Sequence, residues 1–145
     1  MAKYTNLIKS VELNKFFNNY TVIDLETTGL SPYANDIIEI SAIKYRQNRK
    51  VAEYVTLVKT EQDIPPNITR LTGITNKMLT NAPDPRTAIL GLFDFIRSDV
   101  LVGYNITFDL AFLNYNCDLF WAGDKVIKNN YIDVMSLTKR YVPSL

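Results

Sequence analysis

The chain contains no histidine and only one cysteine, Cys117, among its 145 residues. The missing histidine removes the commonest general base and metal ligand at neutral pH. A single cysteine excludes an internal disulfide and a cysteine-rich zinc site, and it is typical of proteins from a reducing compartment. We interpret Cys117 as a core thiol, because no neighbouring residue indicates an activated nucleophile.

Long apolar runs and an excess of one charge are also missing. No segment is apolar over the length needed to span a bilayer, and the first residues lack the features of a secretory signal. We therefore expect a cytoplasmic protein without a membrane partner. Lys and Arg total 16 against 15 acidic residues, so any nucleic acid must be held by local contacts rather than by an overall positive field.

The spacing of apolar residues predicts one α/β domain with a mixed five-stranded sheet. Three strands form an antiparallel meander, and two later strands alternate with helices. A leader helix precedes them within residues 1–19, an extended connector occupies 64–67, and a last helix follows Asp133 with Met135, Leu137 and Tyr141 facing the core. The expected strands are 21–25, 37–45, 51–58, 100–102 and 126–132, and the expected helices after the leader are 75–79, 86–97, 107–116 and the segment after Asp133.

Basic residues surround the predicted turn between the second and third strands. Such charges at a hairpin end are usually solubilising edge residues, and we prefer that interpretation to a phosphate-binding patch. The residues are Lys44, Arg46, Arg49 and Lys50.

The first predicted strand ends in two carboxylates, Asp24 and Glu26, separated by one residue. Side chains at i and i+2 of a strand point to the same face. Neighbouring carboxylates repel each other, so this pattern favours a bound cation, with Mg²⁺ the natural candidate. Thr27, Thr28 and Gly29 follow with small side chains and backbone N–H groups that a phosphate or sugar could approach. For an isolated Asp-x-Glu, a strand ending in a polar turn is the commoner alternative.

A third acid, Asp109, lies in the first turns of a predicted helix that follows a buried strand. Alone it is explained by a favourable interaction with the helix dipole, and Asn105 by a local turn or cap. Together with Asp24-x-Glu26 the pattern is more specific. It resembles the DEDD superfamily of 3′-to-5′ exonucleases, whose first motif is Asp-x-Glu and whose second is Asn-x-x-Phe-Asp.

The resemblance covers residues 20–145 and is nearest to proofreading exonucleases of the bacterial DNA polymerase III epsilon type. The segment Leu71-Thr-Gly-Ile-Thr75 is similar to the loop that helps to form the family's pocket for the terminal nucleotide. This resemblance, rather than periodicity, implies a ribonuclease-H-like fold and an exonuclease-like domain at 20–145.

The resemblance also implies hydrolysis at the 3′ end of single-stranded or frayed DNA by two metal ions, Mg²⁺ or Mn²⁺. Asp24, Glu26 and Asp109 would be the catalytic metal ligands, and a DNA polymerase is the implied protein partner. These residues do not distinguish DNA from RNA. For Leu71, Ile74 and Phe108, core packing is the alternative to substrate contact. The implied substrate-binding residues are Thr27, Thr28, Gly29, Leu71, Thr72, Ile74, Asn105 and Phe108.

The family's third motif, a His followed by an Asp, has no counterpart before Leu145, and the family's C-terminal helix is missing with it. Asp133 could replace the fourth acid, but its position before Val-Met-Ser predicts a helix N-cap. We therefore expect slow hydrolysis or none. One alternative is a catalytically impaired nucleic-acid-binding or polymerase-associated module with the same fold, and another is a structural domain whose acids are coincidental.

Overall fold

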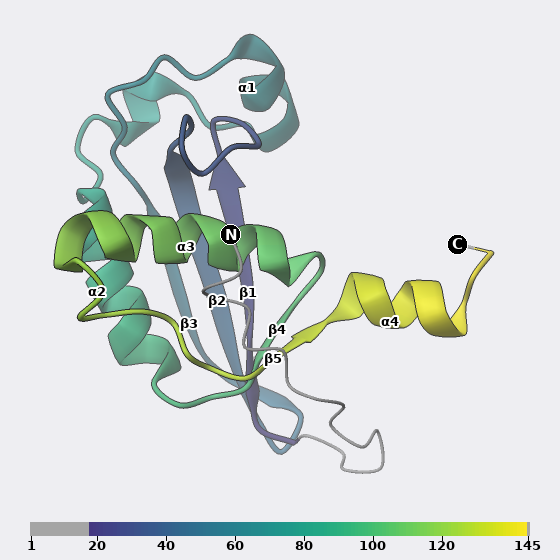
Figure 1. Ribbon diagram of the computed structural model, residues 1–145. Coiled ribbons are helices and arrows are strands. Elements are labelled where there is room, and N and C mark those ends of the chain that lie inside the picture. The colour runs from purple at the N-terminus through teal and green to yellow at the C-terminus, as the bar shows by residue number, and fades with distance from the viewer. Residues whose placement is uncertain (1–17, 145) are drawn as a thin grey trace.

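The computed structural model describes residues 18–144, which form a mixed five-stranded sheet with helices packed on one face (Figure 1). The strand order is β3-β2-β1-β4-β5, with antiparallel pairs among β1, β2 and β3 and parallel pairs from β1 to β4 and β4 to β5. The predicted mixed α/β sheet is therefore confirmed. The elements are β1 (Tyr20–Thr27), β2 (Ile37–Arg46), β3 (Arg49–Leu57), α1 (Pro66–Thr72), the 3₁₀ helix η1 (Asn76–Leu79), α2 (Pro85–Ile96), β4 (Leu101–Gly103), α3 (Ile106–Trp121), β5 (Tyr131–Asp133) and α4 (Val134–Tyr141).

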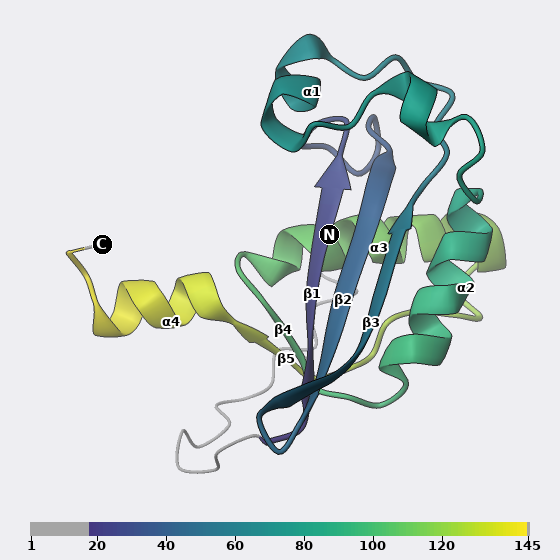
Figure 2. The same cartoon turned by 180° about the vertical axis from the view of Figure 1, so that it is seen from behind.

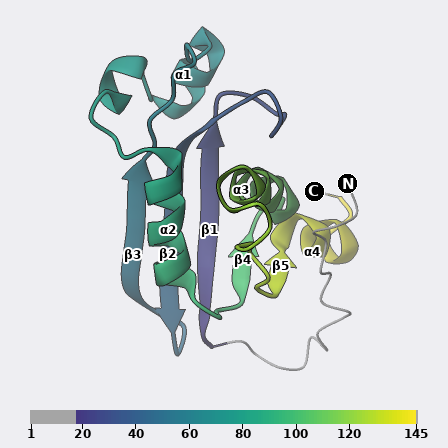
Figure 3. The same ribbon diagram turned by 60° about the vertical axis from the view of Figure 1, so that its left-hand side comes forward.

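The main core lies between the sheet and helices α2 and α3. In β1 the buried Ile23 and Leu25 stand opposite Ala42 and Ile40 of β2, so these four side chains share the face that the helices cover. Asp24 and Glu26 alternate with them and point to the other face, which no helix covers over β1 to β3 in Figure 2. Figure 3 shows α2 and α3 side by side on their common face.

A smaller apolar cluster holds the α1 lobe, residues 59–83, against the end of the sheet. Ile38 of β2 packs there with Ile64, Ile74 and Leu79. In Figure 1 this lobe lies beyond the arrowhead of β1, so the chain that follows Glu26 lies beside it.

Three predicted boundaries are wrong. The connector at 64–67 was expected to be extended, but α1 begins at Pro66, since a proline in the first helical turn loses no intrahelical hydrogen bond. The last strand is only Tyr131–Asp133 instead of 126–132, because its partner β4 offers three residues to pair with. Helix α3 continues to Trp121, well past residue 116.

The last helix was expected to pack on the core, and this expectation is also wrong. None of the residues of α4 is buried, and Tyr141 is 56% exposed. Figure 1 shows α4 projecting away from the sheet. The predicted leader helix lies outside the described residues, apart from Asn18, which is not helical. Within residues 18–144 no helix has the length and apolarity required to cross a membrane.

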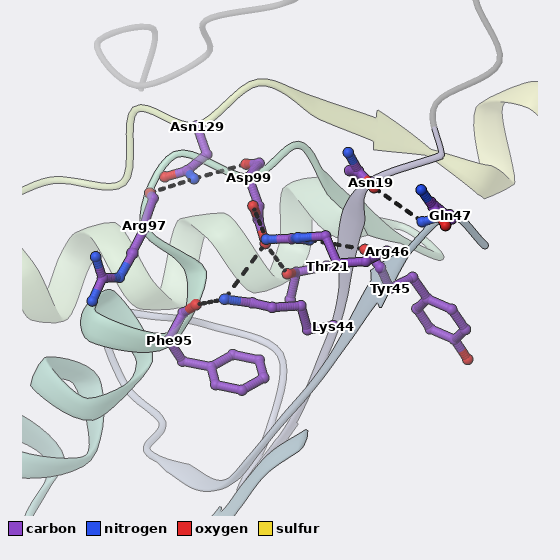
Figure 4. Close-up of polar contacts among 10 residues, drawn as sticks. All are labelled: Asn19, Thr21, Lys44, Tyr45, Arg46, Gln47, Phe95, Arg97, Asp99 and Asn129. Atoms are coloured by element: carbon purple, nitrogen blue, oxygen red, sulfur yellow. Dashed lines mark hydrogen bonds and ion pairs between the residues drawn. The ribbon is translucent and has the colours of Figure 1, made fainter. Parts of the chain in front are cut away.

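Asp99 lies in the loop after α2 and contacts the start of β1 and the end of β2, at the end of the sheet opposite the α1 lobe (Figure 4). Its carboxylate accepts a hydrogen bond of 2.6 Å from Thr21 Oγ1 and one of 2.7 Å from Arg46 Nη2, and Lys44 Nζ lies 3.8 Å away. Lys44 also donates to the carbonyl of Phe95. Burial alone would raise the pKa of Asp99, but the Thr21 and Arg46 hydrogen bonds and the Arg46 and Lys44 charges together lower it. Asp99 therefore stabilises the fold in its ionised form.

The basic residues at this hairpin end differ in their surroundings. Lys44 and Arg46 pair with the partly buried Asp99, whereas Lys50 pairs with Glu53 on the exposed surface. The interpretation as solubilising edge residues therefore suits Lys50, while Lys44 and Arg46 make internal ion pairs that the sequence did not predict.

Replacing Asp99 should expose the importance of this ion cluster. We expect Asp99→Ala to lower the free energy of unfolding by roughly 2 to 3 kcal/mol, because two partly buried cations and a buried hydroxyl lose their acceptor. Glu53→Ala is the matched control, and it should have little effect since both partners of that pair are exposed. Urea unfolding of the three proteins checks this, and equal losses in both variants would contradict it.

Candidate nucleic-acid-processing site

Asp24 and Glu26 lie on the open face of β1, where the strand is about to end. Asp24 is exposed and Glu26 is half-buried. The pairing register with β2 shifts between Glu26 and Thr27, which marks a bulge directly after the second acid. A bulge breaks the alternation of side chains, so the residues after Glu26 leave the strand in a new direction.

Asp109 reaches the same strand from helix α3. The N–H groups of Thr21 and Leu25 both point toward β4, and Thr21 N donates to Val100 O. Strand β4 ends at Gly103, so Leu25 N has no strand partner and donates instead to Asp109 Oδ1 at 2.8 Å. Asp109 is only 3% exposed. The early end of β4 thus places the third predicted acid beside the first two.

Asp24 and Glu26 lie close enough to Asp109 for their charges to affect its pKa. Burial raises the pKa of Asp109 to about 7, with the hydrogen bond from Leu25 opposing the rise and the charges of Asp24 and Glu26 adding to it. Burial and then the charges of Asp24 and Glu39 raise the pKa of Glu26. Asp24 faces solvent, yet partial desolvation raises its pKa as well. Each carboxylate is therefore less easily ionised than usual.

Glu39 is a fourth acid at this edge that the sequence reasoning missed. It stands directly opposite Glu26 in the antiparallel pair of β1 and β2. The segment Ile37-Ile-Glu-Ile40 places Glu39 in a predicted strand, but only the register of the two strands shows that it lies opposite Glu26.

The chemistry of these donors fits hard divalent cations, which prefer carboxylate oxygens. The geometry is less complete, because in residues 18–144 no three His, Cys, Asp or Glu side chains are gathered into a group that could hold a metal ion. Asp109 Oδ1 is also engaged by the Leu25 backbone.

The threonines after Glu26 use their hydroxyls within the protein. Thr27 Oγ1 donates to Gly29 O at 2.6 Å, and Thr28 Oγ1 donates to Gln62 Oε1 at 3.0 Å. A β-carbon on Gly29 would lie 2.6 Å from the Asn35 side chain, so any larger residue there would have to displace that side chain. These residues shape the loop beside the acids.

The Leu71–Ile74 segment presents one apolar side chain outward. Leu71 is 80% exposed, whereas Ile74 is 3% exposed and packs in the core of the α1 lobe. The Thr72 hydroxyl donates to Ile68 O and accepts from Ile74 N. Gly73 ends α1 at φ 78°, in the left-handed region that glycine adopts without strain. Core packing therefore explains Ile74, while Leu71 remains free for a ligand.

Asn105 and Phe108 also have internal roles. Asn105 adopts a left-handed conformation at φ 56°, and its backbone N donates to Asp133 Oδ1 at 2.9 Å. Phe108 packs on Phe112 with ring centroids 5.0 Å apart. Asp133 caps α4 through Met135 N at 3.0 Å, as its sequence position predicts.

Comparison with known proteins shows the family to which the chain belongs. A family model described as Exonuclease matches residues 21–145. The chain belongs to the exonuclease family. It is 34% identical over 139 residues to the PolC-type DNA polymerase III of Thermotoga petrophila, and 31% identical over 126 residues to the DNA polymerase III subunit epsilon of Treponema pallidum. The resemblance to DEDD exonucleases of the epsilon type is thereby confirmed.

The exonuclease domain covers only part of these relatives. The matches span 92% and 87% of this chain but 10% of the PolC-type polymerase and 58% of the epsilon subunit.

Solved structures share the fold. Exonuclease X in complex with 5′-overhanging duplex DNA superposes with a TM-score of 0.66 at 24% identity, covering 87% of this chain and 66% of its own. Exonuclease I from E. coli with a dT13 oligonucleotide gives a TM-score of 0.69 at 16% identity, covering 86% and 29%. Exonucleases of this family generally use divalent metal ions.

The raised pKa of Asp109 predicts a pH-dependent stability of the exonuclease domain. The folded pKa lies above the unfolded value, so this contribution is complete at about pH 4 and is lost as the pH rises through about 7. We expect the free energy of unfolding in EDTA to fall by roughly 2 to 4 kcal/mol between about pH 4 and about pH 8. Asp109→Asn should flatten most of this dependence, since its amide oxygen still accepts from Leu25 N. Urea unfolding across the pH range tests this, and parallel curves for both proteins would refute it.

Proposed function

We propose that this exonuclease domain removes nucleotides from the 3′ end of a DNA strand, as a domain of the DNA polymerase III proofreading type. The observation that carries the proposal is the meeting of Asp109, delivered by α3, with Asp24 and Glu26 on β1. The polymerase III relatives and the DNA-bound neighbours support both the substrate class and a polymerase as partner.

Asp24, Glu26 and Asp109 are the residues that would hold Mg²⁺ or Mn²⁺. Bound there, divalent ions would neutralise charge on the scissile phosphodiester and lower the pKa of a water molecule. Burial is the main cause of the raised pKa values of Glu26 and Asp109, and repulsion from neighbouring acids adds to it. That repulsive part supports this assignment, because an added positive charge relieves it. Since no three ligands are gathered beforehand in residues 18–144, we expect weak binding that favours Mn²⁺ over Mg²⁺.

The α1 lobe would supply contacts to the terminal base. Leu71 is the exposed apolar side chain of the Leu71–Thr75 segment, and an apolar contact with a base face is tolerant of sequence. The backbone after the bulge at Glu26 would contact the terminal sugar and phosphate.

For residues 1–145 taken by themselves, we expect slow turnover. The sequence has no histidine to take the proton of the attacking water, and Asp133 is engaged by Asn105 N, Met135 N and the Ser136 hydroxyl. Loss of a general base typically costs about two to four decades of rate. The same observations favour a second candidate function, a DNA-binding or polymerase-associated module that does not turn over.

Metal binding should depend on Asp24. We expect calorimetric titration to show Mn²⁺ binding to the wild-type protein and a loss of at least about tenfold in affinity for Asp24→Asn, because one charged ligand is removed. Glu53→Gln, also an exposed carboxylate of the sheet, is the control for net charge and should bind like the wild type. Equal affinities for all three proteins would rule out the site.

Hydrolysis should proceed from the 3′ end and require the same carboxylates. We expect slow Mn²⁺-dependent shortening of a 5′-labelled single-stranded oligonucleotide, lost in Asp24→Asn and in Asp109→Asn. Binding without shortening would favour the non-catalytic module. Shortening that persists in both variants would overturn the assignment of the acids.

A further inference from the structure

Four residues form a closed ring of hydrogen bonds beside the acidic edge. Thr28 Oγ1 donates to Gln62 Oε1 at 3.0 Å, and Gln62 N donates to Thr60 Oγ1 at 3.0 Å. Thr60 Oγ1 donates to Asp36 Oδ2, and Asp36 N returns to Thr28 Oγ1 at 3.0 Å. The hydroxyls of Thr28 and Thr60 each both donate and accept, so the two bonds that meet at each hydroxyl strengthen each other.

Gln62 extends this ring in two further directions. Its Nε2 donates to Ala34 O at 3.1 Å, and its carbonyl accepts from Asn76 Nδ2 at 2.8 Å. Asn76 Oδ1 in turn accepts from Ile64 N at 2.9 Å. Gln62 therefore uses its backbone N–H, its backbone carbonyl and both polar atoms of its amide.

The bonds of Gln62 connect three separate stretches of chain. Thr28 and Ala34 belong to the loop that follows Glu26, Thr60 follows β3, and Asn76 opens η1 on the far side of α1. The α1 lobe is also attached by the small apolar cluster around Ile38 and by the hydrogen bond from Thr60 to Asp36. Directed hydrogen bonds add an orientational requirement to these contacts. Gln62 makes more of these bonds than Thr60 does, and it is thus one of the residues that fix the lobe to the loop after Glu26.

We propose that Gln62 is a positioning residue for the 3′-terminal nucleotide. It holds the α1 lobe, and with it the exposed side chain of Leu71, at a fixed place relative to Asp24 and Glu26. A base resting on Leu71 then presents its phosphodiester to the carboxylates. This inference rests on the proposed function and adds a residue outside the acidic motifs to it.

The test measures binding of a single-stranded oligonucleotide, labelled at its 5′ end, by fluorescence anisotropy in Mn²⁺. We expect Gln62→Ala to raise the Kd about five- to tenfold, as loss of one or two net hydrogen bonds implies. Glu61→Ala is the neighbouring control, and it should stay within about twofold because that carboxylate is exposed. Where hydrolysis is measurable, its rate at saturating oligonucleotide should fall with Gln62→Ala as well.

A double-mutant cycle separates positioning from a general loss of stability. If Gln62 acts through Leu71, the effects of Gln62→Ala and Leu71→Ala on the Kd are not additive, and the double variant binds about as weakly as Leu71→Ala. A purely structural role would weaken binding without this coupling. Additive effects, or an unchanged Kd for Gln62→Ala, would overturn the inference.

A second variant keeps the test decisive if Gln62→Ala fails to fold. Asn76→Asp retains the acceptor for Ile64 N but removes the donor to Gln62 O, and it should show the same coupling to Leu71→Ala. Additivity there would also overturn the inference. A wild-type protein that binds no oligonucleotide would overturn the proposed function itself, whereas wild-type binding weakened by Leu71→Ala alone would leave that function intact and reject the role of Gln62.

Discussion

The hydrogen bond from the Leu25 backbone to the Asp109 carboxylate is the contact on which the candidate site depends. Strand β4 ends after Gly103, and this short strand leaves one N–H of the central strand β1 without a partner. A buried N–H without an acceptor is costly, so the fold requires a substitute. Helix α3 supplies it with a carboxylate rather than a carbonyl. The same bond that completes the sheet therefore places a third carboxyl group next to Asp24 and Glu26.

The acidic residues of this edge disfavour folding. Burial raises the pKa values of Asp24, Glu26 and Asp109, and neighbouring acidic charges add to the rise for Glu26 and Asp109, so the protein without bound cations folds in spite of its acidic edge. The compensation lies elsewhere, in the apolar layer between the sheet and helices α2 and α3 and in the ion cluster around Asp99. Binding and catalytic sites often contain groups that reduce the stability of the fold, and the rest of the protein compensates for them.

Sequence reasoning succeeded where a pattern repeats along one element and failed where distant segments meet. Alternation in β1 predicts the shared face of Asp24 and Glu26, and Asp133 is recognisable as a cap from its neighbours alone. The length of β5 depends on β4, and the burial of Ile74 depends on contacts from β2, so neither follows from local pattern. The resemblance implies substrate contacts for Thr27 and Thr28, but the sequence does not predict that their hydroxyls donate to Gly29 O and Gln62 Oε1. These acceptors lie in a bulged loop and in a distant segment, so local pattern gives no sign of them.

Asp133 illustrates how one carboxylate can tie two helices together. One of its oxygens, Oδ1, accepts from Asn105 N at the start of α3 and from Met135 N at the start of α4. Helix α4 projects from the body without a buried residue. The bonds to Asp133 connect the start of this helix to the start of α3, whose first turn carries Asp109. A displacement of α4 would therefore act on the helix that brings Asp109 to β1.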